Sequence, residues 1–122
     1  MYLQRRKKSD MESGGCEVAY WRKANQIRKW FVDNTGYLED ADCLMHKITK
    51  EQIEQLVSDC RKVMENGSLA GELMPSSEGF FFGNTEINEI YFRQIREIVR
   101  MVTEVIAETD WNNEDVFYYE WW

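Results

Sequence analysis

Apolar residues recur at helical spacing early in the chain. Within residues 17–34, helical spacing is followed by Tyr20, Ala24, Ile27 and Phe31, and Trp30 widens this apolar stripe. They fall every three to four residues, which is typical of an amphipathic helix. Asn34-Thr35-Gly36 follows as a helix stop. The pattern predicts a first helix over residues 17–34, with Tyr20 and Ala24 facing the core.

Thr49-Lys50-Glu51-Gln52 marks the start of a second helix. It matches a capping box, in which the Thr49 side chain accepts a hydrogen bond from the Gln52 amide and the Gln52 side chain reaches back to Thr49. The apolar positions that follow form one stripe and are Ile53, Leu56, Val57, Cys60, Val63 and Met64. Asn66-Gly67 predicts the end of this helix.

A third and longer helix is predicted over residues 85–108. One face of this helix holds Ile87, Tyr91, Ile98, Val102 and Val105, and alongside it lie Ile90, Ile95, Met101 and Ile106. At 1.5 Å per residue this helix would span roughly 36 Å. The charges on its polar side alternate in sign along Glu89, Arg93, Glu97, Arg100 and Glu104. Their spacing predicts ion pairs one helical turn apart, which favour solubility.

Two further segments are densely aromatic. The first is Gly79-Phe80-Phe81-Phe82-Gly83, an apolar loop that we expect to pack against the first helix. The second is residues 116–122, with five aromatic side chains in its last six positions, which we expect to dock on the helices as a strand-like arm or to meet another chain. The predicted fold is all-α: a compact three-helix domain with a long third helix, an aromatic loop and a docked aromatic C-terminal tail.

The length of 122 residues and the apolar fraction of 43% predict one domain with one core. We assign this helical domain to residues 16–122. Residues 1–15 contain Arg5-Arg6-Lys7-Lys8 and then Ser13-Gly14-Gly15, so we expect a flexible basic N-terminal tail there. In the alternative interpretation, the cations of residues 5–8 contact an acidic partner.

Charge and hydropathy restrict the location and the partners. No apolar run approaches the roughly 18 residues of a membrane span, and no apolar segment follows the basic cluster as in a secretory signal, so we expect a cytoplasmic protein without a membrane partner. Residues 1–50 hold ten Lys/Arg and seven Asp/Glu, a charge of +3, whereas residues 51–122 hold five and fifteen, a charge of −10, which together give −7. This acidity disfavours direct nucleic-acid binding, because phosphates would be repelled.

Catalytic and metal-binding motifs are weak in this sequence. Cys43 and His46 are three residues apart, and Cys16 with Cys60 would complete a four-ligand zinc site. The irregular spacing, and the place of Cys60 on an apolar helix face, favour three ordinary thiols instead. The chain has no Gly-x-Ser-x-Gly and no phosphate-binding glycine loop. We expect no catalytic residue, metal or cofactor and no enzymatic activity, with a hydrolase or metalloenzyme as the weaker alternative.

The segment Trp21-Arg22-Lys23-Ala24-Asn25 is the best candidate for a binding surface. A Trp beside cations and an amide can stack a planar ligand or anchor a protein interface. In a second interpretation, Trp21 closes the edge of the core and Asn25 hydrogen-bonds the backbone of residues 79–83. The candidate binding residues are Trp21, Arg22, Lys23, Asn25, Phe80, Phe81, Phe82, Tyr91, Trp121 and Trp122.

Several motifs together resemble a family of small uncharacterised proteins from bacteriophages and prophages. They are Tyr20-Trp21-Arg22-Lys23-Ala24-Asn25-Gln26-Ile27, Trp30-Phe31-Val32, Leu73-Met74-Pro75-Ser76, Gly79-Phe80-Phe81-Phe82-Gly83-Asn84-Thr85, Tyr91-Phe92, and Phe117-Tyr118-Tyr119 with a terminal Trp. The resemblance covers residues 18–122. The chain departs from the family at Glu120-Trp121, where the family has two serines before the last Trp, and at His46, which the family's connector often lacks.

The resemblance carries over no site residue, but it implies a phage origin. Small acidic accessory proteins of phages are often binding proteins that modulate the host, and anti-CRISPR proteins are one such class. We therefore expect a non-enzymatic accessory protein in the host cytoplasm that binds a host protein, such as a defence nuclease or its complex. Exposed aromatic patches would also allow a homo-oligomer. The alternative is a protein that binds a small molecule or nucleotide through the Tyr20–Asn25 segment and the phenylalanine loop.

Overall fold

The computed structural model describes residues 1–8, 16–21, 24–35, 46–75 and 89–119. These residues form four strands, which are β1 (Tyr2–Lys7), β2 (Cys16–Tyr20), β3 (His46–Ile48) and β4 (Glu114–Tyr119). They also form helices α1 (Asn25–Thr35), α2 (Lys50–Glu65), α3 (Ala70–Leu73) and α4 (Glu89–Glu108), with a 3-10 turn η1 (Gly67–Leu69) before α3. The all-α prediction is therefore wrong, and the fold mixes helices with an antiparallel sheet.

The sheet has the order β2-β1-β4-β3, so the first and last strands of the chain lie side by side at its centre. The register of β1 and β4 pairs Arg6 with Asp115 and Lys7 with Glu114. Opposite charges directly across an antiparallel pair are favourable, which allows a strongly basic segment to occupy a central strand. The expected flexible basic tail is therefore wrong for residues 2–7, while residues 9–15 lie outside the described residues.

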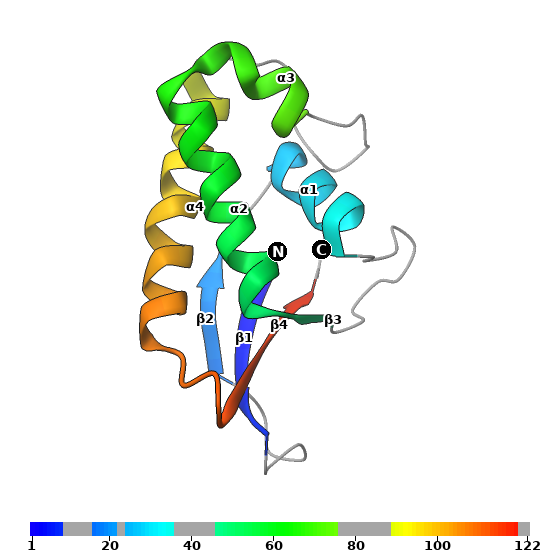
Figure 1. Cartoon of the computed structure of the whole chain (residues 1–122), viewed down its shortest axis with the longest axis vertical. Helices are drawn as coiled ribbons and strands as arrows, with labels where there is room; N and C mark the ends of the chain where they lie inside the picture. The colour runs from blue at the N-terminus through cyan, green and yellow to red at the C-terminus, as the bar shows by residue number, and fades with distance from the viewer. Residues whose placement is uncertain (9–15, 22–23, 36–45, 76–88, 120–122) are drawn as a thin grey trace.

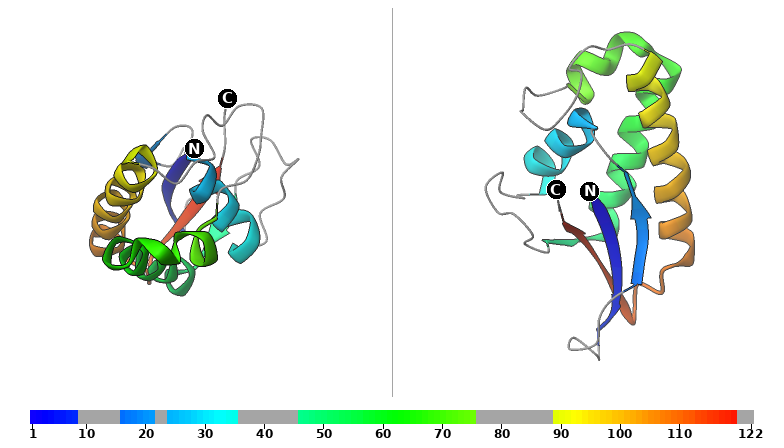
Figure 2. Two further views of the ribbon diagram at one scale, coloured as in Figure 1. Left: turned by 90° about the horizontal axis from the view of Figure 1, so that it is seen from above. Right: turned by 180° about the vertical axis from the view of Figure 1, so that it is seen from behind.

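The helices cover one face of the sheet. Helices α2 and α4 run side by side along it, and α1 lies near the end where β2 finishes and β1 begins (Figure 1). In the view from behind, the strands lie in front of the helices, and no described helix crosses their outer face (Figure 2). The molecule thus has a helical layer and a sheet layer, with the core between them.

The core takes residues from both layers. Alternate strand residues face the helices, because successive side chains in a strand point to opposite sides. The strand residues buried in this way include Leu3, Ala19, Ile48, Val116 and Tyr118. The helices contribute Ile27, Phe31, Ile53, Leu56, Ile95, Ile98 and Val102, all at most 1% exposed.

The first predicted helix is only partly correct. Residues 16–20 form β2, and α1 begins at Asn25. Pairing with β1 aligns Tyr20 with Tyr2 and Ala19 with Leu3, which turns Ala19 into the core and leaves Tyr20 46% exposed. The expectation that Tyr20 faces the core is therefore wrong. Successive side chains of a strand point to opposite faces, so Tyr20 points outward when Ala19 points into the core.

The second helix is confirmed with its capping box. Thr49 Oγ1 accepts a hydrogen bond from the Gln52 amide at 3.1 Å, and the Thr49 amide donates to Gln52 Oε1 at 2.9 Å. The helix ends at Glu65, and Asn66 is its C-terminal cap. Of the predicted stripe, Met64 is 44% exposed and the other five residues are buried.

The third predicted helix corresponds to α4, whose described part begins at Glu89. Tyr91, Ile95, Ile98, Val102 and Val105 are buried against α2 and the sheet, whereas Ile90 is 48% exposed. No helix among the described residues has the length and apolar character needed to cross a membrane.

Candidate functional site

The described residues include only part of the predicted binding set. Trp21 follows β2 and is 7% exposed, and Tyr91 on α4 is 2% exposed. Asn25 is the first residue of α1. The remaining candidates, Arg22, Lys23, Phe80, Phe81, Phe82, Trp121 and Trp122, lie outside the described residues.

Trp21 belongs to the aromatic part of the core. Its ring centroid lies 6.2 Å from that of Phe31 and 6.1 Å from that of Tyr118. This position agrees with the interpretation in which Trp21 closes the edge of the core. The indole Nε1–H is nevertheless buried with no hydrogen-bond partner in the described part of the chain, and a buried N–H group without a partner is rare in folded proteins.

Tyr91 has a structural role in this fold. Its hydroxyl donates a hydrogen bond of 2.6 Å to the Met74 carbonyl, and so joins α4 to the residue that follows α3. Burial is the largest cause that raises the pKa of the Tyr91 phenol, followed by the charge of the nearby Cys60. The Tyr91 side chain is therefore held inside the molecule rather than presented to a partner.

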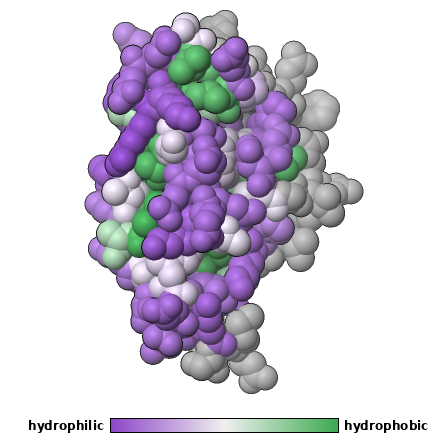
Figure 3. Space-filling model, viewed as in Figure 1, coloured by the Kyte–Doolittle hydropathy of each residue, from purple (hydrophilic) through white to green (hydrophobic). Residues whose placement is uncertain are grey.

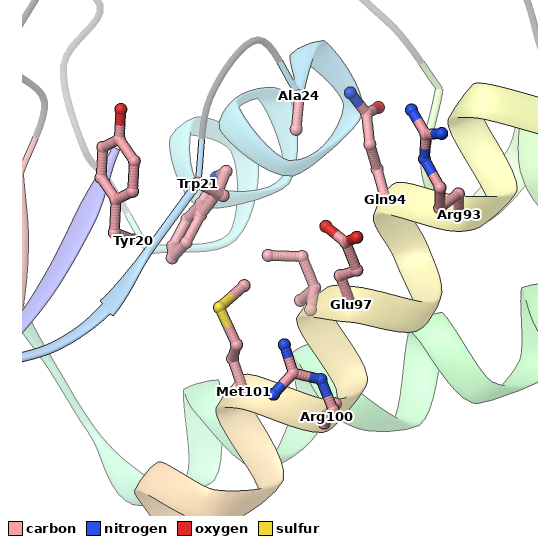
Figure 4. Close-up of a pocket in the computed structure, with 9 residues that line it drawn as sticks. Tyr20, Trp21, Ala24, Arg93, Gln94, Glu97, Arg100 and Met101 are labelled. Atoms are coloured by element: carbon pink, nitrogen blue, oxygen red, sulfur yellow. The ribbon is translucent and has the colours of Figure 1, made fainter.

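A cavity of about 460 Å³ lies between the end of β2 and α4, and Trp21 forms part of its wall (Figure 4). Tyr20, Trp21 and Ala24 line one side. The side made by α4 consists of Arg93, Gln94, Glu97, Ile98, Arg100 and Met101. Because these six residues recur at helical spacing, one face of α4 supplies the whole of that wall.

The cavity combines an apolar floor with a charged rim. Ile98 is buried, Met101 is half-buried, and Arg93, Glu97 and Arg100 are exposed. Gln94 is held in place because its Oε1 accepts a hydrogen bond of 2.9 Å from Gln26 Nε2. Such a mixture of apolar surface and a few oriented polar groups is typical of ligand sites.

The charged residues of the rim do not pair with one another. Arg93 and Glu97, and Glu97 and Arg100, are one turn apart, and the sequence predicted ion pairs between them. No ion pair joins these three residues within the described part of the chain, and Figure 4 shows their side chains directed apart. That part of the prediction is wrong, and the charged groups remain available around the cavity.

The outer face of the sheet carries a second candidate surface, which we call the tyrosine row: Tyr20, Tyr2 and Tyr119 on three adjacent strands. The Tyr2 and Tyr119 rings stack with centroids 4.8 Å apart, and the Tyr2 and Tyr20 centroids are 5.0 Å apart. Phe117 lies in the next row, opposite Gln4 and Lys47. This places four aromatic residues on a face that no described helix covers.

The three cations beside the tyrosine row each have a polar partner. Arg6 Nε donates to Gln4 Oε1 at 2.8 Å, and Asp115 lies 3.5 Å from Lys47 and 3.7 Å from Lys8. By contrast, the face made by the helices is mostly hydrophilic, with small hydrophobic areas between the charged side chains (Figure 3).

The sequence contained signals for both surfaces. Outward Tyr2 and Gln4 flank inward Leu3, and outward Phe117 and Tyr119 flank inward Tyr118. This alternation indicates strands, but the adjacent cations hid it in β1. On α4, the arginines that line the cavity were interpreted as solubilising charges, because the position of Trp21 beside them depends on the tertiary structure.

The cysteines and the histidine do not form a metal site among the described residues, where no group of three His, Cys, Asp or Glu side chains lies close enough to hold a metal ion. Cys16 is exposed, whereas Cys60 is buried with its Sγ 3.5 Å from Met74 Sδ. His46 Nε2 lies 2.6 Å from the Thr35 carbonyl oxygen. Cys43 lies outside the described residues.

Comparisons with the models of known protein families, with curated proteins and with solved structures give no match.

Proposed function

We propose that this protein is a phage accessory protein that acts by binding a host protein through the outer face of its sheet. The observation that carries the proposal is the tyrosine row together with Phe117. Tyrosine and phenylalanine are enriched at the centres of protein interfaces. A surface of this kind at an otherwise polar molecule favours recognition of another macromolecule.

The stacked geometry supports binding without a large entropic penalty. Tyr2 contacts both Tyr20 and Tyr119, so each ring restricts its neighbours before any partner arrives. Side chains that are already ordered lose less rotamer freedom on binding. A rigid aromatic row therefore presents apolar area and hydroxyl groups at a lower cost than isolated flexible side chains.

The net charge supports a particular class of partner. The chain carries −7, so a protein with a basic surface is attracted to it at long range and associates faster. Because Arg6, Lys8 and Lys47 stand beside the tyrosine row, the row itself would meet an uncharged or acidic part of that protein. Basic protein surfaces are common where nucleic acid binds. We therefore propose a host protein with a basic nucleic-acid-binding surface, such as a nuclease of a defence system, which the resemblance to phage proteins also favours.

Site-specific crosslinking tests this proposal. Phe117 is replaced by the photoreactive analogue p-benzoylphenylalanine, which is also aromatic, and exposed Glu54 on α2 receives the same residue as a control. After irradiation in host cells, we expect adducts with one host protein from position 117 and none with that protein from position 54. The same adducts from both positions would show that the sheet is not the contact surface.

The captured protein is then tested for direct binding. Phe117→Thr and Tyr119→Thr retain strand propensity while removing the rings, and we expect the double variant to bind at least 10-fold more weakly. Glu54→Ala should bind within twofold of the parent chain.

The inhibitory role is tested by plating a sensitive phage on cells that carry the defence system. The parent chain should restore plaques and the double variant should not. Absence of restoration would overturn the inhibitory role.

A further inference from the structure

We infer that the cavity beside Trp21 is a nucleotide site, in which an arginine of the rim, Arg93 or Arg100, binds the phosphate, Glu97 accepts a hydrogen bond from a base amino group, and Tyr20 stacks on the base. This inference does not require the proposed protein partner, because the cavity lies between β2 and α4, and Tyr20 is the residue that it shares with the tyrosine row. The cavity has a volume of about 460 Å³, which lies within the range of small-ligand cavities.

The arginines supply the strongest argument. Arg93 and Arg100 are exposed cations at the rim of one cavity, in a chain of net charge −7. Neither forms an ion pair within the described residues, although Glu97 stands one turn from both. Guanidinium groups bind phosphate oxygens through parallel N–H donors. An anionic ligand would therefore provide the partner that Glu97 does not.

Glu97 restricts the ligand further. Its carboxylate lies between the two arginines along α4 and is directed into the space that Figure 4 shows. An ionised carboxylate can accept hydrogen bonds but cannot donate them. Glu97 therefore repels a simple polyanion and favours a ligand that also carries an N–H donor. A nucleotide with an exocyclic amino group offers phosphate and donor within one small molecule.

The aromatic residues of the cavity wall are suited to contact with the base of a nucleotide. Tyr20 is 46% exposed on the edge strand and lines the cavity, so its ring is accessible to a planar base. Bases stack on aromatic side chains with little dependence on sequence. Trp21 forms the adjacent wall, and its buried Nε1–H has no hydrogen-bond partner among the described residues.

The test uses the full chain and adenosine monophosphate, with binding measured by calorimetry and by amide and indole chemical shifts. We expect saturable binding that shifts the indole N–H resonance of Trp21, identified from its loss in Trp21→Phe. The double variant Arg93→Ala, Arg100→Ala should weaken binding at least 10-fold. Arg96→Ala is the matched control, because Arg96 lies on the same helix but does not line this cavity, and should bind within twofold.

Ligand variants separate the three contacts. Adenosine, which lacks phosphate, should bind as weakly as adenosine monophosphate binds to the double arginine variant. Inosine monophosphate, which lacks the amino group, should bind at least fivefold more weakly to the parent chain, and Glu97→Ala should remove that difference. Phe117→Thr with Tyr119→Thr should retain the nucleotide affinity, which keeps this test separate from that of the protein partner.

Two results would overturn the inference. One is the absence of binding at millimolar adenosine monophosphate to a chain whose melting temperature shows that it is folded. The other is binding that Arg96→Ala weakens as much as the double arginine variant does, because the contact would then be a general charge effect along α4.

Discussion

Phe31 of α1 and Tyr118 of β4 stack face to face, with ring centroids 4.0 Å apart and planes inclined by 10°. Both side chains are fully buried. Trp30 meets the edge of the Phe31 ring at 5.3 Å, with an interplanar angle of 88°. This stack joins the first helix to the last strand, and so connects the helical layer to the sheet across most of the chain length.

Removal of the Phe31 ring should therefore destabilise the whole domain. We expect Phe31→Ala to lower the free energy of unfolding by about 3–5 kcal/mol, because it removes buried apolar area and leaves a cavity beside Tyr118. Urea unfolding followed by tryptophan fluorescence measures the loss. Lys29→Ala on the same helix is the control. Its side chain pairs with Asp33 at the surface, so its loss should stay below about 0.5 kcal/mol. A similar loss in both variants would contradict a structural role for the stack.

The same stack shows which parts of the fold the sequence could predict. Local signals determined α2, where a capping box and a terminal Asn66 lie within a few residues of what they define. The partner of Phe31 was harder to identify, since aromatic residues occur in several segments. We expected the loop of residues 79–83 to pack against the first helix, and that loop lies outside the described residues. The ring that stacks on Phe31 in the structure is that of Tyr118.

The sheet could not be predicted because its pairing is long-range. β1 pairs with β4, more than 100 residues away, and no local motif specifies that pairing. The four consecutive cations of residues 5–8 are typical of a solvated tail when considered alone. They are compatible with a central strand only because β4 places Glu114 and Asp115 opposite them.

Only one wall of the candidate cavity could be predicted from the sequence. The sequence neighbours of Trp21 made it a candidate binding residue, and in the structure Trp21 forms part of a cavity wall. The other wall of its cavity comes from Arg93 to Met101 on α4, and helical periodicity alone cannot indicate which solvated face of α4 meets residue 21. The arrangement of the layers decides that contact.

The two tryptophans near Phe31 allow a matched test of buried hydrogen bonds. Trp30 Nε1 donates to Asp59 Oδ2 at 2.9 Å, and Gln55 donates to the other carboxylate oxygen at 2.8 Å. Trp21 Nε1 is buried and has no hydrogen-bond partner within the ranges that the structure describes. Trp→Phe at either position removes a similar volume, so the difference between the variants reports the hydrogen bond.

We expect Trp30→Phe to lose about 1.5–3 kcal/mol more of unfolding free energy than Trp21→Phe, since it removes a donor from a buried charged acceptor. Trp21→Phe removes an unsatisfied donor and should remain within about 1 kcal/mol of the parent chain. Chemical denaturation of the two variants in parallel measures the difference. Equal losses would mean that the Trp30–Asp59 bond contributes nothing net to stability.

Stability should fall at alkaline pH because of Cys60. Burial, with a smaller contribution from the charge of Asp59, raises the pKa of the Cys60 thiol from 9.0 to about 12. The unfolded chain loses this proton near pH 9, whereas the folded chain retains it to about pH 12. The folded state therefore binds more protons in this range, and the stabilisation present below pH 9 is lost as the pH rises towards 12. The raised pKa of Tyr91 acts in the same direction.

Urea unfolding at intervals between pH 8 and 10.5 measures this slope. We expect Cys60→Ala to have a shallower decline than the parent chain, whatever its stability at pH 8. Cys16 is exposed, so Cys16→Ser should retain the parent slope. A slope that is unchanged in Cys60→Ala would exclude Cys60 as the source.

The N-terminal strand leads to the last prediction, which separates a central strand from a basic tail. Leu3 is fully buried and β1 is hydrogen-bonded on both edges, to β2 and to β4. We expect deletion of residues 1–7 to abolish cooperative unfolding. Without them, β2 would lose its only neighbour among the described strands, and Val116 and Tyr118 of β4 would lose the strand that pairs beside them. The milder Leu3→Ala should lower the free energy of unfolding by about 2–5 kcal/mol, while exposed Lys7→Ala should change it by less than about 0.5 kcal/mol. Circular dichroism and urea unfolding measure both effects. A deleted chain that unfolds cooperatively at the parent midpoint would instead identify residues 1–7 as a dispensable tail.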